Sequence, residues 1–152
     1  MLKLAKQTKN SGGFTLMEVL LSVALIALIA GLSIPVYQTL QVRNDLDVAA
    51  TTATETLRRA QVLSQAVDGD ARWGVHMQSG SITLFQGASY ASRNEEFDEV
   101  FAVPTVITPS GTKEFVYAKF SGLPQTTGTL TLTSDNDETR NITVNEKGTI
   151  TY

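Results

Sequence analysis

The chain has 152 residues, of which 42% are hydrophobic and 18% are charged, and it contains no cysteine. This length allows one anchor and one modest domain, and the lack of cysteine excludes a disulfide framework and thiolate metal ligands. The formal charge of -3 excludes a general electrostatic attraction to nucleic acid or to anionic membranes.

The chain begins with a short basic segment that runs into a long apolar one. Residues 1–13 contain Lys3, Lys6 and Lys9 and no acidic residue, so the rest of the chain has nine basic and fifteen acidic side chains. Lysines on this side of an apolar segment predict that residues 1–13 are cytoplasmic and that the C-terminal part lies outside the membrane.

Glu18 is the single charged residue between Phe14 and Ile34. A charged side chain in a membrane-spanning helix costs roughly 2.5–3.5 kcal/mol at the centre and less near the ends. Such an acid normally has a partner, and the apolar segment supplies no lysine, arginine or histidine. We therefore expect the partner of Glu18 to be a group other than the side chains of this apolar segment.

The residues Gly13–Glu18, with lysines before them and about twenty apolar residues after them, resemble the prepilin signal of type IV pilins and type II secretion pseudopilins. The resemblance implies cleavage between Gly13 and Phe14 by a prepilin peptidase, followed by N-methylation of Phe14. It also implies that the apolar helix stays in the mature protein and that Pro35 kinks it. An ordinary signal anchor that is never cut is the alternative.

Cleavage would leave a positive amine on Phe14, one helical turn from the Glu18 carboxylate. Two such charges in apolar surroundings are costly apart and largely offset one another when paired. The resemblance implies that Glu18 of an incoming subunit meets the Phe14 amine of its neighbour and sets the register of a filament. A pair within one subunit before assembly, or a Glu18 side chain that reaches the membrane interface, are the alternatives.

The helix is predicted to continue beyond the apolar segment. One apolar face recurs at spacings of three and four residues, which is typical of an amphipathic helix: Leu46, Ala50, Ala53, Leu57, Ala60, Ser64 and Val67. Asp68-Gly69-Asp70 is predicted to end it. The chain then divides into a leader (1–13), a transmembrane or assembly helix (14–35), an amphipathic continuation (36–68) and a β-rich domain (69–152).

The last segment has the period-two pattern of short strands. Residues 73–77 and 82–86 predict a hairpin around Ser79-Gly80, and residues 87–99 predict a polar, acidic loop. Residues 100–107, interrupted by Pro104, predict an edge strand or two short pieces. Further strands are predicted at 114–120, 129–133, 141–144 and 149–152. The fold class is α+β and type IV pilin-like, one long helix packed on six or seven antiparallel strands.

This second half also resembles the GspH/FimT-like minor pseudopilins. The matching segments are Leu57–Gln61, Phe120–Gly122, Gly128–Leu132, Arg140–Val144 and Gly148–Ile150, whereas residues 87–112 have no match.

Other candidate sites carry weaker signals. His76, the only histidine, lies on a predicted strand without a nucleophile motif, so a packed or surface role is favoured over a catalytic one. Asp135 and Asp137 are weak candidates for calcium, and a hairpin turn is favoured because the EF-hand pattern is absent.

Two arginines and four aromatic residues complete the candidates. Arg58 and Arg59 could touch DNA, but a solvated helix end or pairing with Glu55 is favoured. The aromatic residues are expected in the core under the helix: Trp73, Phe115, Tyr117 and Phe120.

The sequence thus predicts a non-enzymatic filament subunit, a minor pilin or pseudopilin, with no catalytic site and no cofactor of its own. Its expected partners are the prepilin peptidase/methyltransferase, other pilin or pseudopilin subunits, the inner-membrane assembly platform and, before assembly, membrane lipid. Its expected location is the cytoplasmic (inner) membrane and then a pilus or pseudopilus. A DNA-binding or adhesive minor pilin and an uncleaved envelope protein are the alternatives, of which the acidic charge disfavours nucleic acid.

Overall fold

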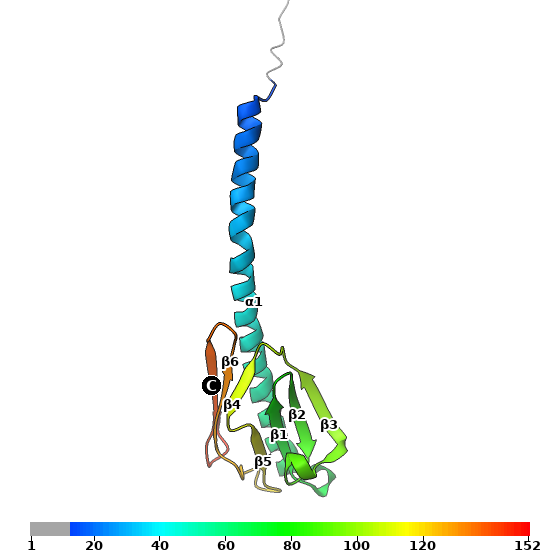
Figure 1. Ribbon diagram of the computed structural model, residues 1–152. Helices are drawn as coiled ribbons and strands as arrows, with labels where there is room; N and C mark the ends of the chain where they lie inside the picture. The colour runs from blue at the N-terminus through cyan, green and yellow to red at the C-terminus, as the bar shows by residue number, and fades with distance from the viewer. Residues whose placement is uncertain (1–12) are drawn as a thin grey trace, which may run out of the picture. The chain divides into compact units, whose positions relative to one another are not determined.

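The computed structural model describes residues 13–152, except for the side chains of residues 32–36. The chain forms two compact units, Met1–Tyr37 and Gln38–Tyr152, and the helix α1 (Leu16–Ala66) has residues in both (Figure 1). The predicted leader, apart from Gly13, lies outside the described residues. The division after Tyr37 falls close to the end of the predicted assembly helix.

The first unit contains the beginning of α1, whose large apolar side chains between Leu16 and Ile29 are exposed. They are Leu16, Met17, Val19, Leu20, Leu21, Val23, Leu25, Ile26, Leu28 and Ile29. The helical backbone continues through Pro35, and the side chain of that residue is outside the described set, so the kink stays a prediction.

Within the described part of the chain, no helix is both long enough and apolar enough to cross a membrane. The predicted span, residues 14–35, includes four of the residues whose side chains are not described.

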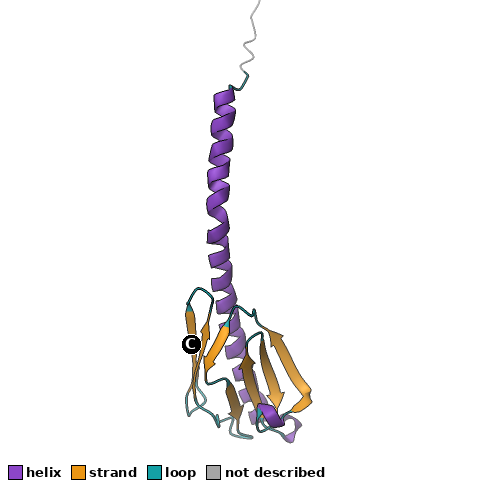
Figure 2. Ribbon diagram, viewed as in Figure 1, coloured by secondary structure: helices purple, strands orange, loops and turns teal. Residues whose placement is uncertain are grey.

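The second unit packs the rest of α1 against two antiparallel sheets (Figure 2). The first sheet has the order β3-β2-β1-β5, with β1 (Trp73–Gln78), β2 (Ser81–Gln86), β3 (Asn94–Ala102) and β5 (Glu114–Tyr117). The second has the order β4-β6-β7-β8, with β4 (Thr108–Gly111), β6 (Gly128–Thr133), β7 (Thr139–Val144) and β8 (Ile150–Thr151). Two 3-10 turns, η1 (Asp68–Asp70) and η2 (Tyr90–Ser92), complete the described elements.

One core joins the helix to both sheets. The helix contributes mostly small residues, which let the backbones approach closely, namely Leu46, Ala49, Ala50, Ala53, Leu57 and Ala60. The first sheet contributes Trp73, Val75, Met77, Ile82, Leu84, Phe115 and Tyr117, and the second Leu130, Leu132, Ile142, Val144 and Ile150. The predicted helix face is thus buried, except that Val67 is only partly covered.

Polar contacts hold the second unit's part of α1, and the turn that follows it, to the sheets. The buried Ser64 hydroxyl accepts the backbone N–H of Trp73 at 2.9 Å, and the Trp73 indole N–H donates to the Asp68 carbonyl at 3.0 Å. Arg140 of β7 also binds Asp47 of the helix at 2.8 Å. The helix ends where predicted, but the turn begins with Val67 at φ 57°, a left-handed conformation that suits glycine better than a β-branched residue.

The predicted hairpin is confirmed, with Gln78 opposite Ser81 across the Ser79-Gly80 turn. The prediction of an acidic loop at residues 87–99 is wrong from residue 94 onward, because Asn94–Ala102 is the edge strand β3. The predicted strand after residue 100 ends at Ala102, before Pro104, and the next strand, β4, includes Pro109.

Phe120 is a second correction. It is 75% exposed, with φ 66°, because β5 ends at Tyr117 and the chain turns before Phe120 could enter the core. Trp73, Phe115 and Tyr117 are buried as predicted. The described residues form eight strands in place of the predicted six or seven.

Candidate functional site

The first turn of α1 begins with reciprocal hydrogen bonds between Thr15 and Glu18. The Thr15 hydroxyl accepts the backbone N–H of Glu18 at 3.2 Å, and the Glu18 carboxylate accepts the backbone N–H of Thr15 at a long 3.5 Å. This is the capping-box arrangement, in which a threonine and a glutamate three residues later satisfy two backbone donors that a helix leaves free. The acid also lies in the first turn, where the helix dipole favours negative charge.

The predicted cleavage bond lies just outside this helix. Gly13 and Phe14 precede the first helical residue, Leu16, and both are exposed, Phe14 by 83%. Neither residue has a helical backbone, so the peptide bond between them lies outside the helix.

Glu18 has no cationic side-chain partner among the described residues. Its contacts there are with Thr15 and, through its backbone carbonyl, with the Ser22 hydroxyl, which donates at 2.7 Å. The structure therefore brings together Phe14, Thr15 and Glu18 at one exposed helix start. Phe14 and Glu18 are expected from the sequence, whereas the role of Thr15 is not, although the spacing Thr15-x-x-Glu18 carries the capping-box signal.

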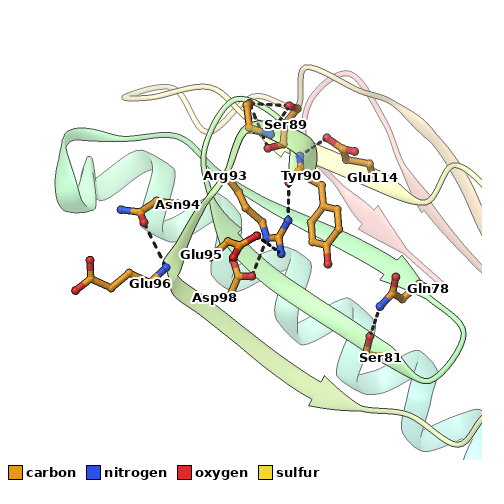
Figure 3. Close-up of polar contacts among 11 residues, drawn as sticks. Gln78, Ser81, Ser89, Tyr90, Arg93, Asn94, Glu95, Glu96, Asp98 and Glu114 are labelled. Atoms are coloured by element: carbon orange, nitrogen blue, oxygen red, sulfur yellow. Dashed lines mark hydrogen bonds and ion pairs between the residues drawn. The ribbon is translucent and has the colours of Figure 1, made fainter.

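His76 belongs to a different cluster, on the face of the first sheet away from α1. Its ring stacks on Tyr90 with centroids 4.0 Å apart, and the Arg93 guanidinium covers the same tyrosine ring at 3.9 Å. The Tyr90 backbone N–H donates to Glu114 at 2.9 Å (Figure 3). The His76 Nδ1 lies 3.8 Å from the same carboxylate. Burial lowers the pKa of His76 below its usual 6.5, Glu114 raises it, and Arg93 and Lys113 lower it further.

This cluster fixes the η2 turn and the beginning of β3 on the first sheet. Arg93 also binds Asp98 at 2.7 Å, so one side chain connects the turn to the strand. The sequence analysis did not foresee the cluster, because Tyr90 and Arg93 lay in the predicted loop and nothing local marks them as partners of His76. No nucleophile stands beside the histidine in the described contacts, and the geometry is that of a packed aromatic stack.

The turn at Asp135 and Asp137 is a hairpin connection, as favoured from the sequence. The Ser134 N–H donates to the Glu138 carbonyl at 2.9 Å, and both aspartates are exposed. In the described part of the chain, no group of three or more His, Cys, Asp or Glu residues is arranged to hold a metal ion.

Arg58 and Arg59, near the end of α1, have different surroundings. Arg59 pairs with Glu99 of β3 at 2.6 Å and not with Glu55, which was one of the two alternatives from the sequence. Arg58 is exposed. One of the two cations is therefore already neutralised by an acidic strand, which weakens the case for a nucleic-acid surface.

Comparison with known proteins bears on both parts of the chain. Residues 8–34 match the prokaryotic N-terminal methylation motif. No curated protein sequence matches the chain. Among solved structures, the chain is similar to the minor pseudopilin EpsH from the type 2 secretion system of Vibrio cholerae. The TM-score is 0.52 at 15% identity, over 70% of this chain and 94% of that one.

The N-terminal match contains the Gly13–Glu18 segment, and the structural similarity supports the predicted fold of one long helix on antiparallel sheets. Residues 8–34 thus carry an N-terminal methylation motif, and the fold of the chain is similar to that of a minor pseudopilin.

Proposed function

We propose that this chain is a structural subunit, a minor pilin or pseudopilin, of a type IV pilus or a type II secretion pseudopilus. The match of residues 8–34 to the N-terminal methylation motif is the observation that carries the proposal. The similarity to EpsH, a minor pseudopilin, supports the same class through the fold. The role is assembly, and the chain acts as the substrate of processing enzymes.

Processing begins at the Gly13–Phe14 bond. A prepilin peptidase cuts this bond, and a methyltransferase activity then modifies the new amine of Phe14. Support comes from the exposure of both residues and from the start of the helix after them. The apolar helix stays with the mature chain, because the cut precedes it.

The apolar side chains of the first unit supply the contacts of assembly. An exposed apolar patch of this extent in a soluble protein marks a surface that another molecule covers. The exposed residues from Leu16 to Ile29 point to all sides of α1, so the molecules that contact them must surround the helix. Before assembly, inner-membrane lipid surrounds these side chains, and after assembly the helices of neighbouring subunits do. The C-terminal unit lies outside the membrane. Pro35 bends the helix near the end of this segment.

Glu18 sets the register between subunits. Its carboxylate has no cation beside it in the described residues, and cleavage creates one at Phe14. Pairing between the Glu18 of one subunit and the Phe14 amine of the next neutralises both charges away from water. The pairing replaces the weak 3.5 Å contact of Glu18 with the Thr15 backbone.

Filament purification tests the proposal. Filaments sheared from cells that express the chain should contain it beside a more abundant subunit, with its N-terminus at Phe14. A chain that stays with the cell membrane under conditions in which filaments are recovered would contradict the proposal. Counting the chain against the major subunit distinguishes a minor from a major role.

A further inference from the structure

The two sheets of the second unit end in four edge strands, and β3 differs from the other three. β8 has two residues, β4 has four and contains Pro109, and the four-residue β5 is continued by a bridge between Tyr117 and Pro124. β3 has nine residues, and no strand in the described part of the chain pairs with its outer edge. A long unpaired edge is a template on which another strand can add.

A groove lies beside this edge. It has a volume of about 290 Å³ and is lined by Thr52, Glu55, Thr56, Arg59 and Phe101, so that α1 forms one wall and β3 the other. Phe97 belongs to the same strand and lies where the pairing of β3 with β2 shifts register, between Asn94 and Glu99. Phe97 is 46% exposed, which gives the edge an apolar surface next to the groove.

The edge and the groove are acidic. β3 contains Glu95, Glu96, Asp98 and Glu99, and Glu55 adds a carboxylate from α1. Arg59 neutralises Glu99, and Arg93 binds both Glu95 and Asp98.

Two of these acids have no such partner. Glu55 and Glu96 are exposed and form no ion pair in the described structure, and Figure 3 shows Glu96 directed away from Arg93. The surface therefore keeps one carboxylate without an ion-pair partner on α1 and one on β3.

The negative charge of this surface favours some binding partners over others. A second copy of the chain would place one acidic β3 against another, and like charges on paired strands are destabilising. Nucleic acid would meet the same repulsion. A strand with basic side chains meets opposite charge, and its apolar side chains can enter the groove.

We propose that the outer edge of β3, together with the groove between β3 and α1, binds an extended segment of a different polypeptide in which apolar and basic residues alternate. Backbone hydrogen bonds to β3 hold the segment as an added strand. Its apolar side chains contact Phe97 and Phe101, its basic side chains meet Glu96, and Glu55 adds to the negative potential that attracts the segment. The surface lies outside the methylation motif, so this proposal does not depend on filament assembly.

A peptide experiment on the full chain in a nonionic detergent tests the proposal. The probe is a synthetic peptide, matched to β3 in length, with alternating valine and lysine. One control replaces every lysine by glutamate, and a second carries N-methyl groups that block strand pairing. We expect the lysine peptide alone to bind in fluorescence anisotropy and to slow hydrogen exchange of the β3 amides.

Charge reversal makes the test specific for this edge. In the double variant Glu55→Lys and Glu96→Lys, affinity for the lysine peptide should fall about tenfold and the glutamate peptide should begin to bind. The matched double variant Asp135→Lys and Glu146→Lys changes two exposed acids elsewhere and should leave both affinities unchanged.

Three outcomes would overturn the proposal. The first is no binding of the lysine peptide, in which case the acids only protect the edge from self-association. The second is binding that leaves exchange at β3 unchanged or that the matched variant weakens equally. The third is a dimer of the unliganded chain that the Glu55 and Glu96 reversals abolish, which would make a second copy the occupant.

Discussion

The Thr15 hydroxyl accepts the backbone N–H of Glu18 at 3.2 Å, and the Glu18 carboxylate reaches back toward the backbone N–H of Thr15. The acid that the proposed assembly needs is therefore held in the first turn of α1 before any neighbour is present. Cleavage after Gly13 would leave Thr15 as the second residue of the mature chain, so both partners of the capping box are kept.

Two substitutions separate the charge of Glu18 from its role as a cap. Glu18→Gln keeps a side-chain oxygen that can accept the Thr15 N–H, whereas Glu18→Ala removes it. If the charge sets the register, both variants should be cleaved and membrane-anchored but absent from sheared filaments, as read by immunoblot. Recovery of Glu18→Gln in filaments at the wild-type level would assign the residue to helix capping alone.

Val67→Gly should stabilise the second unit. Val67 has φ 57° at the end of α1, a conformation that is strained for a β-branched residue and free for glycine. We expect the free energy of unfolding to rise by about 1 kcal/mol, reduced by the lost contacts of a partly buried side chain. Denaturant titration followed by the fluorescence of Trp73, the only tryptophan, measures the change. Val67→Ile keeps the strain, and a rise for that variant as well would refute the explanation.

Tyr117→Phe should leave the second unit as stable or make it more stable. The Tyr117 hydroxyl is buried and has no hydrogen-bond partner in the described structure, and burial raises the pKa of this group. Removing an unsatisfied hydroxyl should raise the free energy of unfolding by up to about 1 kcal/mol. Tyr117→Leu, which leaves a cavity, should lower it by about 2 kcal/mol. A loss of similar size with phenylalanine would mean that the hydroxyl has a partner.

The stability of the second unit should fall as the pH falls below the ordinary pKa of histidine. The pKa of His76 is lowered in the folded chain, so the unfolded chain binds the proton more readily and protonation favours unfolding. The destabilising contribution of His76 to the free energy of unfolding is absent above about pH 6.5. It grows as the pH falls through and below that value. The groups that face the ring are Tyr90, Arg93, Lys113 and Glu114.

His76→Phe keeps a ring to stack on Tyr90 and removes the titration. Urea titrations at a series of pH values should give a smaller slope between neutral and mildly acidic pH for this variant than for the wild type. Equal slopes for the two proteins would assign the pH dependence to the carboxylates.

The amphipathic helix and the first hairpin could be predicted because their signals are local. The face from Leu46 to Ser64 recurs with the helical period, and Ser79-Gly80 lies between two alternating segments. The first half of β3 was missed because four of the nine residues of the strand are acidic, a composition that favours a loop. Its strand conformation is instead stabilised by pairing with β2, by Arg59 of α1 and by Arg93, the residue directly before the strand.

In the candidate site, too, features with a local sequence signal could be predicted and contacts between distant residues could not. Gly13, Phe14 and Glu18 were predicted because they lie within six residues of one another in a recognisable pattern. The stack of His76, Tyr90 and Arg93 joins β1 to the segment before β3, and no spacing in the sequence indicates that these residues meet. Phe120 was misplaced because alternation continues past the point at which β5 ends.

Mass spectrometry of the mature N-terminus tests the central claim most directly. The chain purified from its native membrane or filaments should begin at Phe14 and carry a methyl group on its terminal amine. A mature chain that still carries its lysine-bearing leader would lack the cation expected to neutralise Glu18, and that result would contradict the account.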